Sequence, residues 1–146
     1  MRSKLDVMKW VYASIAVFVL YSVLEFVLNH WVLAPGYPDA YPASSDVQDI
    51  SILRLYTYLG RAIFSFLFVY LFVKGFEGKP GIGEGARFGF WLGLLLHVPF
   101  IFYSLVVTKF GVGLLLVRAG GNLIETVLCG ILANYVYARA AAPPKT

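Results

Sequence analysis

The sequence predicts an all-α protein, a four-helix bundle in which every helix crosses a membrane. Of the 146 residues, 60% are hydrophobic and 14% are charged, whereas a soluble domain is about half apolar and about a quarter charged. The mean hydropathy is +0.75. The apolar residues also fall into four long runs, each close to the ~20 residues that a helix needs to cross a bilayer.

The four predicted spans form one domain that covers residues 1–146. They are residues 10–33, 52–73, 88–107 and 112–137. The first span follows a short basic segment, as in a signal peptide, but it is much longer than the ~7–15 apolar residues of such a peptide. We therefore expect it to be retained. Only residues 108–111 separate the last two spans, which predicts a tight hairpin.

Lysine and arginine are distributed unevenly between the two sides of the predicted bundle. The first loop, residues 34–51, contains Asp39, Asp46 and Asp49 but no lysine or arginine. Lys109 is the one basic residue in the other loop on that side. The opposite side carries eight basic residues: Arg2, Lys4, Lys9, Lys74, Lys79, Arg87, Arg139 and Lys145. Because short cytoplasmic loops are enriched in lysine and arginine, we expect both termini to be cytoplasmic.

Several ionisable side chains interrupt the apolar runs. An ionised group at the bilayer centre costs about 2.5–3.5 kcal/mol on insertion scales, so such groups usually face protein or water. Helical spacing places the polar residues of each span on one stripe, and we expect the stripes to meet inside the bundle. The candidate polar site consists of Glu25, Arg61, His97, Asn122 and Glu125, with Arg118 on the same stripe of the fourth span.

Within this candidate site we expect opposite charges to pair. Glu25 and Arg61 lie at similar depth on adjacent antiparallel spans, which predicts an ion pair. Glu125 is expected to pair with His97 or with Arg61. A fully paired network would fix the register of the helices, whereas the same residues could instead bind a proton, an ion or a ligand. The sequence leaves both interpretations open.

Glycines form a second pattern, at the start of the third span. Gly85, Gly89 and Gly93 recur every fourth residue, which predicts a small-residue face that lets two helices approach closely. The preceding GIGEG segment resembles a phosphate-binding loop, but no GK[ST] follows it and no strand precedes it, so nucleotide binding is not expected. Glu84 is expected to favour the dipole at the helix start, and Arg87 to contact lipid headgroups.

Other classes of function find no support in the sequence. The single cysteine, Cys129, lies in an apolar run and is expected to pack between helices, so we expect no disulfide and no thiolate metal site. His30 and His97 lie at different depths, so they are not expected to hold haem. We expect no cofactor, no metal site and no catalytic residues. The basic residues form no stripe, so no nucleic-acid partner is expected.

Two parts of the chain resemble a known group of proteins. His30 with the downstream Tyr37, and the segment KGFEGKPGIGEGARFGFWLG, resemble a loose group of small bacterial inner-membrane proteins with four transmembrane helices. The resemblance implies location in the bacterial inner membrane but no particular activity. Small multidrug transporters also have four spans and a glutamate in the first. This chain is longer, has a large first loop, and carries Glu25 late in its span.

Two functions from different classes follow from these observations. The first is a non-enzymatic membrane protein that forms a homo-oligomer or serves as an accessory subunit of a larger membrane complex, with the lipid bilayer as its immediate partner. The alternative is a small proton- or ion-coupled transporter that uses Glu25, His97 and Glu125. A dry, fully paired polar interior would favour the first function, and a water-accessible cavity that reaches Glu25 or Glu125 would favour the second.

Overall fold

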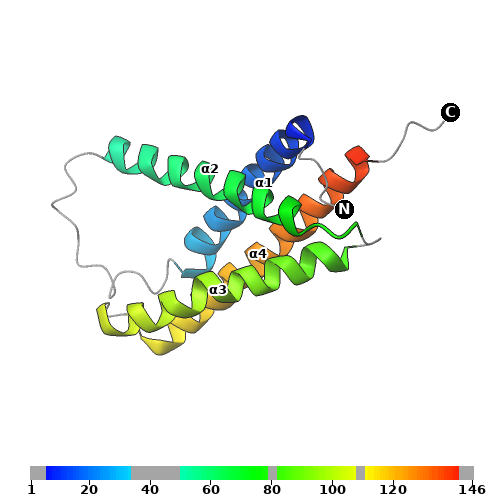
Figure 1. Ribbon diagram of the computed structural model, residues 1–146. Helices are drawn as coiled ribbons and strands as arrows, with labels where there is room; N and C mark the ends of the chain where they lie inside the picture. Colours follow the sequence, from blue (N-terminus) through cyan, green and yellow to red (C-terminus); the bar gives the residue numbers. More distant parts are fainter. Residues whose placement is uncertain (1–5, 34–49, 79–81, 108–110, 142–146) are drawn as a thin grey trace.

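A computed structural model of the chain consists of four long α-helices (Figure 1). The structure describes residues 6–33, 50–78, 82–107 and 111–141. The helices are α1 (Val7–Val27), α2 (Ile50–Gly75), α3 (Gly83–Val107) and α4 (Val112–Ala141), and α1 continues as a π-helix, η1 (Leu28–Leu33). All four are long and apolar enough to cross a membrane. The predicted all-helical fold with four apolar helices is confirmed, while the orientation of the termini stays a prediction.

The α1 and α3 helices begin well before the predicted apolar runs. The α1 helix begins at Val7 because Asp6 caps it: the Asp6 side chain accepts the Lys9 backbone N–H at 3.3 Å and lies 3.1 Å from Lys9 Nζ. Such a cap satisfies a backbone donor that the first turn leaves free. The α3 helix begins at Gly83 rather than Phe88, because packing against α4 keeps this glycine-rich segment helical.

The helices pack unequally on one another. The α3 and α4 helices form a closely packed antiparallel hairpin, and α1 packs between α4 and α2 (Figure 1). The α2 and α3 helices make little backbone contact. Instead, the Phe88 ring of α3 lies between them, with its centroid 5.2 Å from the Phe68 ring and 5.4 Å from the Phe72 ring of α2.

The hydrophobic core occupies the end of the bundle where α1 and α3 begin and where α2 and α4 end. At this end, the ring of Phe76, which follows α2, lies 5.5 Å from that of Tyr137 near the end of α4. Trp10 of α1 donates its Nε1–H to the Phe66 carbonyl of α2 at 3.2 Å. The buried core residues are Ala13, Val17, Phe68, Val69, Phe72, Val73, Cys129, Ala133 and Tyr137.

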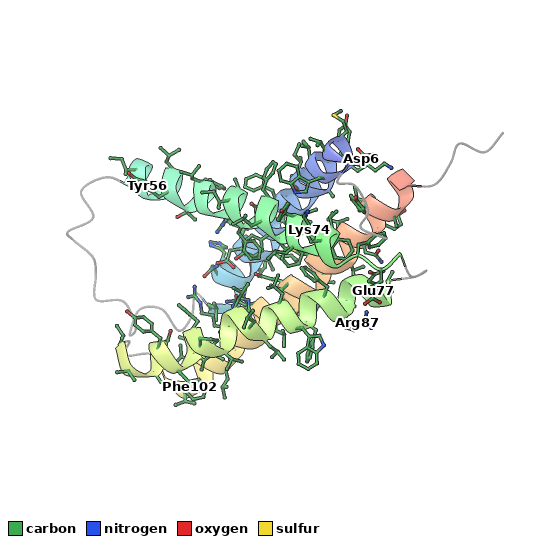
Figure 2. The ribbon with its side chains drawn as sticks, viewed as in Figure 1. Asp6, Tyr56, Lys74, Glu77, Arg87 and Phe102 are labelled. Carbon is green, nitrogen blue, oxygen red and sulfur yellow. The ribbon has the colours of Figure 1, made fainter. Side chains whose placement is uncertain are left out.

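The opposite end of the bundle is splayed. Residues 54–60 of α2 are all exposed, and a Cβ atom added at Gly60 would meet no atom within 4 Å. Figure 1 shows the start of α2 diverging from the other helices. Tyr56 near the start of α2 and Phe102 near the end of α3 stand well apart there (Figure 2). The predicted bundle therefore closes tightly at only one of its two ends.

The last part of the first apolar run is wound as a π-helix, which the sequence pattern did not predict. Asn29 donates its side-chain Nδ2–H to the Glu25 carbonyl at 2.8 Å. Leu28 and Leu33 are buried, so the wider turn still presents apolar side chains to the bundle. Short π-helical segments next to α-helices occur often at functional sites, and this one begins at Leu28, three residues after Glu25.

Candidate functional site: a buried carboxyl pair

The glycine face of α3 sets the position of α4, which carries half of the site. A Cβ atom added at Gly85 would lie 2.2 Å from the Gly130 carbonyl oxygen, and one at Gly89 would lie 2.2 Å from the Thr126 carbonyl oxygen. At Gly93 it would lie 2.2 Å from Thr126 Oγ1. All three glycines thus face α4 and permit backbone contact.

The structure brings the two carboxyl groups of the candidate site together. Glu125 of α4 is 3% exposed and lies at hydrogen-bonding distance from the carboxyl group of Glu25 on α1. Neither oxygen of Glu125 accepts a hydrogen bond from an N–H or hydroxyl donor among the described residues. Two carboxyl groups can bond to each other only when one of them carries a proton. Glu25 and Glu125 could therefore bond to each other if one of them carried a proton.

The expected ion pair between Glu25 and Arg61 does not form among the described residues, and this prediction was wrong. Arg61 instead places its guanidinium over the Tyr58 ring of the same helix, with 5.5 Å between Cζ and the ring centroid. The reason is geometric: α2 diverges from the bundle just before Arg61, and the Tyr58 ring is the nearer partner. Arg61 still lies close enough to Glu125 to interact with it electrostatically.

His97 and Asn122 lie beside the carboxyl pair, in a narrow pocket between α3 and α4. Arg118 lines the same pocket and places its guanidinium 5.9 Å from the centroid of the Phe100 ring. His97 interacts electrostatically with Glu25 and with Arg118. The expected pairing of Glu125 with His97 or Arg61 is not an ion pair in the described residues, since Glu25 is the group that meets the Glu125 carboxyl.

The polar interior is incompletely paired. Hydroxyl groups near the site are satisfied within their own helices: Ser65 donates to the Arg61 carbonyl at 2.8 Å and Thr126 to the Leu123 carbonyl at 2.9 Å. By contrast, Ser22 Oγ, His97 Nε2 and Asn122 Oδ1 are buried with no hydrogen-bond partner among the described residues, and the two Glu125 oxygens meet no N–H or hydroxyl donor there. A network whose only role was to fix helix register would be expected to satisfy these atoms.

The predicted site left out several residues that build this region. Tyr21 lies one turn before Glu25 and interacts electrostatically with Glu25, Arg61 and Glu125. Its spacing of four residues from Glu25 was the available signal. Thr126 and Gly130 supply the α4 surface against the α3 glycines. No motif in α4 indicated which of its small residues would meet α3.

A second polar group lies at the well-packed end of the bundle. The Glu84 carboxylate accepts the Glu77 backbone N–H, and Arg87 Nη2 lies 3.4 Å from Glu77 Oε2. Figure 2 shows Glu77 and Arg87 side by side near the start of α3. Glu84 is 8% exposed, and its hydrogen bond holds the segment after α2 against the start of α3. The sequence had suggested only that Glu84 would interact favourably with the dipole of α3.

Among the described residues, no group of three or more His, Cys, Asp or Glu side chains could hold a metal ion. The carboxyl pair and its basic neighbours form the candidate site. Searches of protein-family models, curated proteins and solved structures returned no match for this chain.

Proposed function

We propose that this chain is a multi-pass protein of the bacterial inner membrane, with cytoplasmic termini, that couples proton binding to the movement of an ion or small solute. Insertion is supported by the four long apolar helices and by large apolar side chains left exposed on them, such as Trp91 at 64% and Val106 at 87%. The orientation is supported by the uneven distribution of lysine and arginine.

The observation that carries the proposal is the Glu25–Glu125 pair. With one proton shared, the two carboxyl groups bond to each other and carry a single negative charge. Without it, two adjacent negative charges repel each other. The pair therefore has two states that differ in charge and in mutual attraction. A difference of this kind is what couples proton binding to a conformational change or to the binding of a second ion.

The basic neighbours stabilise the ionised state of the pair. Arg61 and Arg118 both interact electrostatically with Glu125, and His97 interacts with Glu25. A buried charge without compensation is strongly destabilising, so these groups keep the deprotonated pair accessible inside the bundle. When the proton leaves, the ionised carboxylates attract Arg61 of α2 and His97 of α3 more strongly. The protonation state of the pair is thereby linked to α2 and α3.

Infrared difference spectroscopy of the purified protein in lipid vesicles tests the proton site directly. A shift of the bulk pH from acidic to alkaline should remove a protonated-carboxyl band from the wild-type spectrum. Both Glu125→Gln and Glu25→Gln should abolish this band, whereas Glu77→Gln, at an exposed carboxylate, should leave it unchanged. If the wild type shows no such band, or if Glu125→Gln retains it, the pair holds no titrating proton and the proposal fails.

Proton flux provides the functional measurement. Vesicles containing the protein and an internal pH dye should dissipate an imposed pH gradient faster than empty vesicles when a transported ion is present. The Glu125→Gln variant should behave like empty vesicles. Equal rates for wild type and Glu125→Gln across monovalent cations and anions would contradict proton coupling while leaving membrane insertion intact.

A second candidate function is an oligomer or accessory subunit, and the splayed start of α2 favours it. Residues 54–60 are exposed and include Arg54, a charge that lipid does not accommodate without cost. A second copy or a larger complex could cover this segment. Light scattering of the detergent-solubilised protein, combined with native mass spectrometry, distinguishes a monomer from these assemblies.

A further inference from the structure

A groove lies between α2 and α3 at the well-packed end of the bundle, away from the carboxyl pair. Its volume is about 330 Å³, which falls within the range of small-molecule sites. Its wall consists mainly of apolar and aromatic side chains, and two charged residues stand at one end. The lining residues are Phe72, Gly75, Glu84, Arg87, Phe88, Trp91, Leu92 and Leu95.

The shape of the groove follows from how α2 and α3 pack. The Phe88 ring holds the two helices apart, which leaves a channel along the outer side of their seam. The residues of α3 that line it, from Glu84 to Leu95, lie along one helix face. At 1.5 Å per residue this face is about 16 Å long, about half of the ~30 Å hydrocarbon core of a bilayer. One acyl chain covers that depth.

The rim of the groove carries an acid and a base side by side. Arg87 lines the groove, its side chain is 55% exposed, and its Nη2 atom lies 3.4 Å from Glu77 Oε2. This contact is long, so most of the five guanidinium donors remain available. The Glu77 side chain is 50% exposed. Glu84, the other acid here, is buried and accepts the Glu77 backbone N–H. The Glu77–Arg87 contact therefore presents one positive and one negative side chain, each at least half exposed.

We propose that this groove binds one phospholipid of the zwitterionic ethanolamine class, with an acyl chain along α3 and the headgroup at the Glu77–Arg87 pair. Arg87 holds the phosphate, because a guanidinium donates paired hydrogen bonds to phosphate oxygens. Glu77 accepts hydrogen bonds from the primary ammonium group. A choline headgroup has no N–H donor for Glu77, and a glycerol headgroup has no positive charge for it. The exposed Trp91 ring lies along the chain below the headgroup.

The test uses tryptophan quenching by phospholipids with brominated acyl chains. The protein is placed in phosphatidylcholine vesicles that contain, at one low mole fraction, a brominated ethanolamine, choline or glycerol phospholipid. The Trp91 signal is the difference between the wild type and Trp91→Phe. The ethanolamine lipid should show an apparent association with Trp91 about fivefold stronger than the choline lipid, equivalent to about 1 kcal/mol. Arg87→Gln and Glu77→Gln should each reduce this preference to about the choline level.

A second variant separates the groove from the headgroup site. A Cβ atom at Gly75 would meet no atom within 4 Å, and Gly75 lines the groove, so Gly75→Leu should fill the groove without disturbing the fold. It should abolish the preference. The matched control is Gly113→Leu, which also meets nothing within 4 Å and lies outside the groove; it should retain the preference.

Three results would overturn the proposal: equal quenching by all three lipids, which indicates only bulk lipid contact; stronger quenching by the glycerol lipid, which indicates a simple anion site; and an unchanged preference in Gly75→Leu.

The proposal rests on membrane insertion but not on the proton site. Flotation of the vesicles separates the two, because protein that fails to float with lipid contradicts insertion itself. Inserted protein without lipid preference contradicts only the groove.

Discussion

At the scale of single residues, the chemistry that we propose for this protein lies in two carboxyl groups that are far apart in the sequence. Glu25 and Glu125 meet in the interior, where neither oxygen of Glu125 accepts a bond from a fixed N–H or hydroxyl donor of the described residues. A shared proton satisfies both groups at once. This arrangement changes what substitution of either residue should do.

Glu125→Gln should preserve or raise thermal stability in detergent rather than lower it. A glutamine amide can donate a hydrogen bond to the Glu25 carboxylate and so mimics the protonated state. The advantage should grow as the pH rises, because the wild-type pair then loses its proton and its two negative charges repel each other. Melting curves between mildly acidic and alkaline pH provide the measurement. A large loss of stability in Glu125→Gln at every pH would contradict the shared proton.

Arg61→Gln should not rescue Glu25→Gln. Since Arg61 lies over Tyr58 rather than in an ion pair with Glu25, the stability effects of the two substitutions should add instead of compensating. Melting temperatures of the two single variants and the double variant form the required cycle. If the double variant is more stable than Glu25→Gln alone, the two charges are directly paired in the membrane.

At the scale of secondary-structure elements, the α3–α4 hairpin depends on close approach of two backbones. Gly89 faces the Thr126 carbonyl oxygen, while Gly93 faces the Thr126 hydroxyl. A carbonyl cannot move without shifting α4, whereas a side chain can rotate. The two glycines therefore differ in how much an added methyl group should disturb the hairpin.

Gly89→Ala should destabilise the protein by about 1–3 kcal/mol, as overpacking does, and Gly93→Ala should have a smaller effect. Leucine at either position should be worse, since it would push the backbones apart. Gly113→Ala is the matched control, because its added Cβ atom would meet nothing within 4 Å. Chemical or thermal denaturation in detergent ranks the variants. Wild-type stability for both leucine variants would show that these glycines face lipid.

The segment after α2 depends on Glu84. Glu84→Ala removes the acceptor of the Glu77 backbone N–H, so hydrogen exchange at the Glu77 amide should become faster. Glu84→Gln retains an acceptor oxygen and should leave that exchange near the wild-type rate. Mass-spectrometric exchange on a peptide containing Glu77 resolves the two outcomes. Fast exchange in both variants would show that the charge, and not the acceptor, holds the segment.

At the scale of the whole molecule, the structure is packed at one end and open at the other. The core joins the end of α2 to the end of α4, and the carboxyl pair lies beyond it, toward the splayed start of α2. Because α1 and α4 run antiparallel, Val7 and Ala141 lie at the same end of the bundle. A bilayer-spanning protein with this fold must place both ends of its helical region on one side.

Reporter fusions test which side that is. A fluorescent protein fused after Thr146 should be bright, because it should fold in the cytoplasm, and alkaline phosphatase inserted near Asp39 should be active, because it should be exported. The reason is the excess of lysine and arginine at the end that carries the termini. A dark C-terminal fusion combined with an active phosphatase at that terminus would invert the topology.

The sequence by itself determined the helical class, the four apolar helices and the polar residues expected to face the interior of the bundle. Periodicity and composition are local properties, so they indicate where helices lie and which stripe of each is polar. They also placed Gly85, Gly89 and Gly93 on one face. The cap at Asp6, the π-turn after Glu25 and the early start of α3 were not predicted, since each depends on contacts outside the apolar runs. The predicted loop residues 34–49 and the turn at residues 108–110 lie outside the described residues.

Only the tertiary structure decided which polar residues meet. From spacing alone, opposite charges were expected to pair, because an ion pair has a lower free energy than two separate charges in an apolar environment. The helices instead cross so that α1 lies against α4 while α2 diverges, which brings Glu25 to Glu125 and leaves Arg61 over Tyr58. These crossings depend on contacts of glycines and bulky rings between different helices, which the spacing within one helix does not reveal. The stripes are therefore a property of each helix, whereas the carboxyl pair is a property of how the helices pack.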